Sequence, residues 1–117
     1  MKEVTKYHNI NRGYMTLDVW KESVDLSVLV RKKLKIITGL SFKLKAQIED
    51  SIVSVPSNIS EGYSRRYLKE YIQHINYALA SLSENYTQLL ILANSDDIEK
   101  NGLKNMIKNI ILLKINY

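Results

Sequence analysis

The apolar residues of this chain recur at steps of three and four along most of its length, the spacing that places them on one face of an α-helix. The most regular series lies in the second half of the sequence: Leu68, Ile72, Ile75, Leu79, Leu82, Tyr86, Leu89 and Ala93. Alternating steps of four and three keep one seam against neighbouring helices. We therefore expect a long helix over about residues 67–93, with this seam in the core.

The same spacing predicts three more helices, over about residues 17–37, 42–63 and 96–116. Thr16 is placed to cap the first and Ser41 the second, because short hydroxyl side chains accept hydrogen bonds from free N–H groups at helix N-termini. Gly39 is expected to break the chain between these two helices.

Short connections between the four expected helices indicate the fold class. They favour an all-α, antiparallel up-down-up-down four-helix bundle. The length of 117 residues fits one domain over residues 1–117, with residues 1–15 as an N-terminal arm.

The stretch IVSVPSNISEGYSRR, residues 52–66, is predicted to be helical although it contains a proline. Two stripes at helical spacing run through it and the residues before it. The apolar stripe is Ile48, Ile52, Val55, Ile59 and Gly62 or Tyr63, and the polar stripe is Asp50, Ser54, Asn58, Glu61 and Arg65. Pro56 then lies inside the second helix and should kink it, with the backbone groups it frees satisfied by the nearby polar side chains of Ser54, Ser57, Asn58 and Ser60. Gly62 is expected to end the helix in the left-handed conformation.

Some apolar residues exceed what one small bundle should bury. Seven of the ten residues from Met106 to Ile115 are apolar, and Tyr71, Tyr77, Ile91 and Leu92 lie off the seam of the long helix. Self-association would cover this surplus. The alternative is ordinary exposure of a few apolar side chains.

Composition limits the classes of function. The chain is 45% apolar and 25% charged, as in a globular protein, and it has no cysteine. Disulfides, thiolate metal sites and cysteine nucleophiles are therefore excluded, and a reducing compartment fits. The first residues show no apolar signal region, and no apolar run approaches the ~20 residues that span a bilayer. We expect a cytoplasmic protein with no membrane partner.

Four sequence blocks carry a resemblance to a known family. They are Trp20; S-V-P-S-N-I-S-E-G at residues 54–62; K-E-Y at residues 69–71; and L-A-S-L-S-E-x-x-T-Q-L at residues 79–89. Together they resemble the bacterial four-helix-bundle proteins that were first noticed as products of intervening sequences in 23S ribosomal RNA genes, sometimes labelled ribosomal proteins. The resemblance covers about Tyr14 to Tyr117. The chain departs from the pattern at Tyr67, where members carry Ser or Thr as a helix cap, and at Ser60, where alanine is usual.

The resemblance implies a homopentameric, open-centred ring of short bundles with no established enzyme activity. A related branch serves as an accessory factor to reverse transcriptases in diversity-generating retroelements and binds nucleic acid. Nothing distinctive in this sequence places it in that branch.

No constellation of residues indicates an enzyme, a metal site or a cofactor. The histidines are His8 and His74, and Glu70 with His74 offers one helical pair where a di-iron bundle needs two facing Glu-x-x-His motifs. We interpret that pair as a surface contact. The serines of residues 54–60 have no neighbouring base, and the four glycines are isolated, so neither a hydrolase site nor a phosphate loop is predicted. No catalytic residue, metal, cofactor or small-molecule substrate is inferred.

Within the proline segment, Pro56, Asn58, Glu61 and Gly62 are interpreted as a structural motif. Glu61 is expected to pair with Arg65 or with a basic group across a helix or subunit contact. The functional alternative is a catalytic or ligand carboxylate.

The net charge of +5 and the isoelectric point near 9.4 favour a polyanionic partner, although an AT-rich genome would also enrich lysine. Candidate contacts flank the first two turns: Arg31, Lys32, Lys33, Lys35, Lys43 and Lys45, then Arg65 and Arg66 with Tyr63 and Tyr67 beside them. Helix C-termini also attract cations, which is the structural alternative. The sequence thus predicts a non-enzymatic, homo-oligomeric module that binds RNA or DNA. The alternative is a protein-interaction scaffold or a reverse-transcriptase accessory factor.

Overall fold

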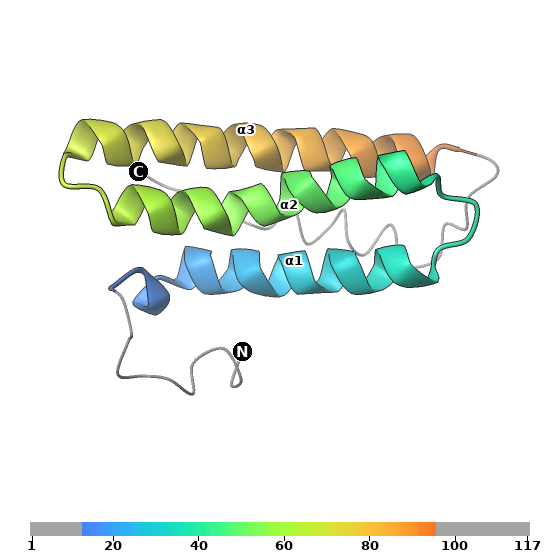
Figure 1. Ribbon diagram of the computed structural model, residues 1–117, viewed down its shortest axis with the longest axis horizontal. Coiled ribbons are helices and arrows are strands. Elements are labelled where there is room, and N and C mark those ends of the chain that lie inside the picture. Colours follow the sequence, from blue (N-terminus) through green and yellow to red (C-terminus); the bar gives the residue numbers. More distant parts are fainter. Residues whose placement is uncertain (1–12, 96–117) are drawn as a thin grey trace.

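The computed structural model describes residues 13–95, and all regular secondary structure in that range is helical, with no strand. A 3₁₀ turn, η2 (Gly13–Thr16), precedes α1 (Asp18–Ile36), α2 (Phe42–Tyr63) and α3 (Leu68–Ala93) (Figure 1). The all-α class is confirmed. The helix expected over residues 96–116, and with it the fourth member of the bundle, lies outside the described residues. So does all of the expected N-terminal arm before Gly13.

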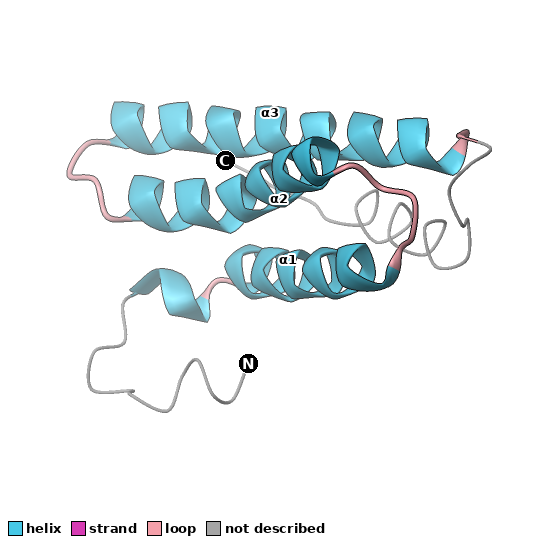
Figure 2. Ribbon diagram, turned by 45° about the vertical axis from the view of Figure 1, so that its right-hand side comes forward, coloured by secondary structure: helices cyan, strands magenta, loops and turns pink. Residues whose placement is uncertain are grey.

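The three helices run alternately up and down, and α2 packs against both α1 and α3 (Figures 1 and 2). The turn between α1 and α2 consequently lies at one end of the helices, and the turn between α2 and α3 lies at the other (Figure 1). No described helix is long and apolar enough to cross a bilayer.

The helix boundaries confirm two of the expected signals and correct a third. Ser41 caps α2, since its hydroxyl accepts a hydrogen bond from the Leu44 N–H at 3.1 Å. Gly39 has a φ of 84°, which a glycine adopts without the steric cost of a side chain. Thr16 does not cap α1: the N-cap is Leu17, and the Thr16 hydroxyl instead donates to the Gly13 carbonyl at 2.8 Å within η2. The Thr16 side chain therefore stabilises the 3₁₀ turn and does not cap α1.

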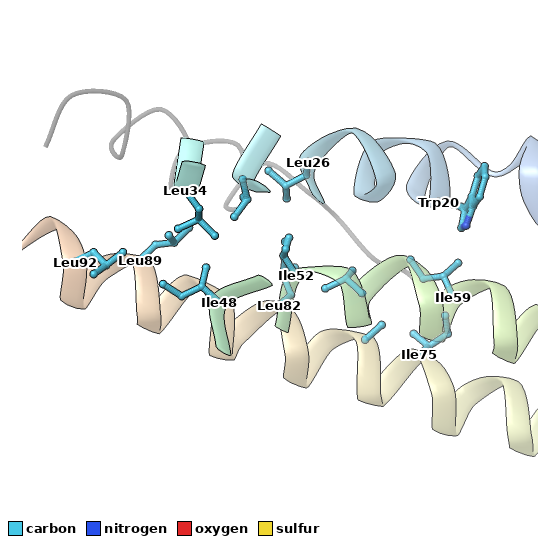
Figure 3. Close-up of a cluster of buried hydrophobic side chains, with 13 residues drawn as sticks. Trp20, Leu26, Leu34, Ile48, Ile52, Ile59, Ile75, Leu82, Leu89 and Leu92 are labelled. Atoms are coloured by element: carbon cyan, nitrogen blue, oxygen red, sulfur yellow. The ribbon is translucent and has the colours of Figure 1, made fainter. Parts of the chain in front are cut away.

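The core is a continuous cluster of side chains from all three helices (Figure 3). The apolar stripe predicted for α2 is confirmed, because Ile48, Ile52, Val55 and Ile59 are all fully buried. Burying each such side chain contributes about 1.5–3 kcal/mol relative to leaving it exposed. These residues make α2 the central element of the described core.

The buried face of α3 is rotated relative to the predicted seam. Its buried positions are Ile75, Ala78, Leu82, Asn85, Leu89 and Leu92, so only three of the predicted positions, Ile75, Leu82 and Leu89, belong to it. Leu68 and Ile72 are exposed, and Leu79 and Tyr86 are half-buried. Asn85 lies on this buried face, where it is fully buried and hydrogen-bonds α2, as described below. Leu92, expected in the surplus, is 1% exposed and part of the core, whereas Tyr77 and Ile91 do remain exposed.

Pro56 lies inside α2 without ending it, as predicted, and the axis of α2 changes direction near its middle (Figure 2). Proline removes the N–H that would bond the carbonyl of Ile52. The Ser27 hydroxyl of α1 reaches this carbonyl at 3.2 Å. Of the side chains expected to help, Ser57 donates to Val53 at 2.8 Å, and Asn58 to Ser54 at 2.9 Å. The carbonyl left free by the proline is thus served from the neighbouring helix rather than from its own.

Candidate nucleic-acid interface

The hairpin of α1 and α2 carries six cations and no acid between Leu26 and Ile48. The cations are Arg31, Lys32, Lys33, Lys35, Lys43 and Lys45. Arg31, Lys32, Lys35 and Lys43 are exposed, while Lys33 and Lys45 are half-buried. Lysine and arginine stems commonly lie on apolar surface with the charged ends in water. The structure therefore brings all six predicted residues to one end of the helices.

None of these six side chains forms an ion pair with another residue in the range 13–95. The helix dipole accounts for only part of the group. Lys33 and Lys35 lie in the last turn of α1, where the dipole favours positive charge. Lys43 and Lys45 lie at the start of α2, where it disfavours positive charge, and no acid occupies that first turn. The cations of α2 thus have no ion-pair or helix-dipole explanation among residues 13–95.

Two apolar side chains stand among these cations. Phe42 is 86% exposed and Ile36 is 67% exposed. The sequence reasoning gave neither residue a binding role, because an apolar residue at a helix boundary resembles an ordinary core position. A ring with free faces beside unpaired cations is a combination that single-stranded nucleic acids use for stacking.

The second basic group lies at the opposite end of the helices, so the structure does not join the eight predicted cations into one surface (Figure 1). Arg65 is engaged by Glu61, with Nη2 2.8 Å from Oε1. Arg66 has no ion pair among the described residues, and Tyr63 and Tyr67 lie beside it as expected. The two ends must therefore be considered separately.

The structural motif of α2 contacts α3 through a chain of polar side chains. The side-chain amide of Asn58 donates a hydrogen bond to the Ser54 hydroxyl at 2.9 Å, and its Oδ1 lies 3.1 Å from His74 Nδ1. The Ser81 hydroxyl of α3 donates to the Ser54 hydroxyl at 2.8 Å. The expected pairing of Glu61 with Arg65 is present, and His74 Nε2 lies 4.0 Å from the same carboxylate. Asn58 and Glu61 thus both lie beside His74 of α3.

Gly62 has a different role from the predicted one. It is buried within α2, its φ is not positive, and the C-cap is Ser64. A Cβ atom at this position would lie 2.7 Å from the Cβ of His74. The glycine is therefore needed for the close approach of α2 and α3, not for a left-handed helix end.

The predicted surface contact between Glu70 and His74 is not among the contacts of residues 13–95. His74 instead faces α2 through Asn58 and meets the Tyr77 ring edge-on at 5.8 Å. A helical spacing of four allows a contact within the helix, but the neighbouring helix offers His74 a better-placed partner. Residues 13–95 contain no group of three or more His, Asp or Glu side chains arranged for a metal ion.

A family comparison identifies the chain. The model of the 23S rRNA-intervening sequence protein family matches residues 15–114. The chain belongs to this family. The match includes α1, α2 and α3 of this intervening-sequence protein and extends past Ala93 to residue 114. No curated protein matches the sequence.

Sequence reasoning did not predict a group of polar contacts between α2 and α3 of this intervening-sequence protein. Asn85 donates to the Ile48 carbonyl at 3.1 Å and to the Ser51 hydroxyl at 2.9 Å, and Ser51 donates to Gln88 at 2.7 Å. One available signal was the step of three from Leu82 to Asn85, which continues the buried series from Ile75 and Ala78. A polar residue at a core position indicates a buried hydrogen bond only when its partner helix is known.

Proposed function

We propose that this intervening-sequence protein is a non-enzymatic module that binds RNA or DNA through the α1–α2 hairpin. The observation that carries the proposal is the group of six cations without ion pairs among the described residues, two of which stand at a helix N-terminus. Unpaired positive charge at such a position raises the energy of the isolated chain. A phosphate backbone would neutralise it.

The assembly that we propose has two further parts. A fourth helix over residues 96–116 completes an up-down-up-down bundle with α1, α2 and α3. The bundles then associate into a homo-oligomer, a pentamer in keeping with the family resemblance, in the cytoplasm. One hairpin contacts few phosphates, but a ring repeats the hairpin and multiplies its effect through avidity.

A salt titration tests the binding. Each phosphate contact should add about −0.9 to the log–log slope of affinity against salt for duplex DNA, and about −0.7 for single strands. We expect clear binding at about 50 mM salt that falls steeply as salt increases. Absence of binding to RNA and to DNA at low salt would refute the proposal.

Three matched variants locate the contact. Lys35→Gln and Lys43→Gln each remove one exposed cation from the hairpin, whereas Lys21→Gln removes an exposed cation from the other end of α1. Each hairpin variant should reduce the magnitude of the slope by about 0.7–0.9, and the control should not. Equal effects of all three would indicate that only the net charge matters.

The exposed apolar side chains favour a second candidate, a protein-interaction scaffold. Leu68 is 71% exposed and Ile91 is 59% exposed, both on α3. Capture of partners from native lysate, with and without nuclease, separates the candidates. Partners retained after nuclease treatment would favour the scaffold, and partners lost on treatment would favour nucleic-acid binding.

A further inference from the structure

The turn between α2 and α3 forms a hollow of about 350 Å³ that is open to solvent. Three tyrosines line it, Tyr63, Tyr67 and Tyr71, together with both arginines of the turn. The volume is at the lower end of the 300–1,000 Å³ that is typical of small-ligand pockets. The α2–α3 turn that carries it lies at the opposite end of the helices from the α1–α2 turn (Figure 1).

The tyrosine rings that line the hollow are accessible to solvent, and neighbouring residues restrict their movement. Tyr67 is 62% exposed and Tyr63 is 45% exposed, while Tyr71 is half-buried against the core. The Tyr63 ring packs closely on η2, since a Cβ at Gly13 would lie 2.8 Å from its Cε1. It also meets the Tyr14 ring edge-on at 6.5 Å. A ring held in this way loses little conformational freedom when a ligand stacks on it.

The charge of the hollow favours an anion. No acidic residue is among its lining residues, and Arg66 has no ion-pair partner in the described chain. Arg65 adds a second cation, whose charge Glu61 partly balances at 2.8 Å. No hydrogen bond joins any of the three tyrosine hydroxyls to another residue of the described range.

Aromatic faces, tyrosine hydroxyls and an arginine without an ion pair in residues 13–95 together match one chemical class. A nucleotide presents a flat base for stacking and a phosphate for arginine. The bases of a duplex are stacked on one another and cannot reach such a hollow, whereas single-stranded loops and ends splay theirs out. An apolar ligand would leave Arg66 without a role, and an inorganic anion would leave the rings without one.

We propose that this hollow binds one unstacked nucleotide of a single-stranded nucleic acid, with the base against Tyr67 and Tyr63 and the phosphate at Arg66. The proposal rests on the proposed function for its biological setting, since it assigns that function a preference for single strands. Its chemistry does not depend on the hairpin, so the two are tested separately.

The first experiment compares full-length Tyr67→Ala, Tyr67→Phe and Tyr77→Ala variants with the unaltered protein. Tyr77 is 49% exposed on α3 and does not line the hollow, so it controls for loss of an exposed tyrosine. Loss of one stacking ring should weaken single-strand binding about 5- to 150-fold. Tyr67→Phe should retain most of the affinity, and no variant should change duplex binding. Equal losses for Tyr67→Ala and Tyr77→Ala, or equal losses on single strand and duplex, would overturn the proposal.

The second experiment uses adenosine monophosphate alone, followed by backbone amide chemical shifts. We expect shifts confined to residues 62–71 as the nucleotide rises to about 10 mM, where even a weak complex is populated. No shifts there, or shifts that follow protein concentration instead, would overturn the proposal, and the latter would place a second copy of the chain in the hollow.

Together, the two experiments distinguish failure of the nucleotide site from failure of the proposed function. Shifts at residues 62–71 without any binding of RNA or DNA polymers would reject the proposed function and would limit the hollow to free nucleotides. Salt-dependent polymer binding through the hairpin, with no effect of Tyr67→Ala and no shifts, would keep the proposed function and reject the nucleotide site.

Discussion

The hydroxyl of Ser27 on α1 donates to the carbonyl of Ile52 on α2 at 3.2 Å, the carbonyl whose helical partner is missing because residue 56 is proline. The same hydroxyl lies 2.8 Å from the Ser23 carbonyl, so its one hydrogen serves both acceptors. Ser27 and Ile52 are both buried, so bulk water does not reach this carbonyl. The carbonyl that Pro56 leaves without a helical donor is therefore stabilised by a residue 25 positions before Ile52.

This relationship predicts an energetic coupling between Ser27 and Pro56. Ser27→Ala should cost about 1–3 kcal/mol, because it leaves a buried carbonyl without a donor. In a Pro56→Ala background residue 56 regains its N–H, and the cost of Ser27→Ala should fall to about 0.5 kcal/mol or less. Denaturant unfolding of the four proteins measures the cycle. Equal costs in the two backgrounds would show that the serine does not serve this carbonyl.

Gly62 provides a second prediction about packing. In an exposed helix position, glycine to alanine would stabilise by about 0.8–1 kcal/mol. Here the added Cβ would lie 2.7 Å from the His74 Cβ and 3.3 Å from the Tyr71 carbonyl oxygen. Gly62→Ala should therefore destabilise by about 1–3 kcal/mol, as overpacking does. Thermal unfolding decides it, and an unchanged or raised midpoint would contradict the close approach.

In α2, the buried apolar stripe could be predicted from the sequence, whereas the role of Gly62 could not. Its buried stripe of Ile48, Ile52, Val55 and Ile59 follows from periodicity alone, because burial of one helix face depends on local spacing. The role of Gly62 does not follow from spacing, since it depends on His74, which the fold brings opposite. A glycine near the end of an amphipathic helix has the same local signature in both roles.

In the candidate interface, too, only some of the features could be predicted from the sequence. The position of the cations at two turns could be predicted, because each turn follows from a helix boundary. Whether a cation is paired could not, because Glu61 engages Arg65 while Arg66 in the same turn stays unpaired among the described residues. The hollow beside them includes Tyr71, a residue one helical turn into α3, and only the assembled turn shows it as part of a site.

Asn85 gives a prediction about the polar contact between α2 and α3. Its amide donates to the Ile48 carbonyl and the Ser51 hydroxyl, while Oδ1 has no partner in the described structure. Asn85→Ala should cost about 1–3 kcal/mol, because it removes both bonds and leaves a void. Asn85→Leu should cost less, since it fills the volume and removes the unpaired oxygen. Unfolding in urea measures both, and a larger cost for leucine would show that the hydrogen bonds outweigh packing here.

Glu61→Gln tests the surface ion pair with Arg65. The two side chains are 52% and 45% exposed, so water screens their attraction. We expect a loss of about 1 kcal/mol or less that diminishes as salt increases. Lys21→Gln, at an exposed position with no ion pair in residues 13–95, is a control for the change in net charge. A loss of several kcal/mol would indicate that Glu61 is buried in an assembly contact.

Phe42 offers a prediction that separates stacking from charge in the hairpin. Its ring is 86% exposed beside Lys43, and burial cannot explain it within the described chain. If single-stranded nucleic acid binds there, Phe42→Ala should weaken it by about 1–3 kcal/mol without changing the salt slope, because a stacked base releases no counterions. Lys43→Gln, by contrast, should reduce the magnitude of the salt slope by about 0.7, because it removes a phosphate contact. Fluorescence anisotropy with a labelled single strand at several salt concentrations measures both parameters. A change of slope in Phe42→Ala, or unaltered affinity, would show that the ring does not stack on a base and that the hairpin acts through charge alone.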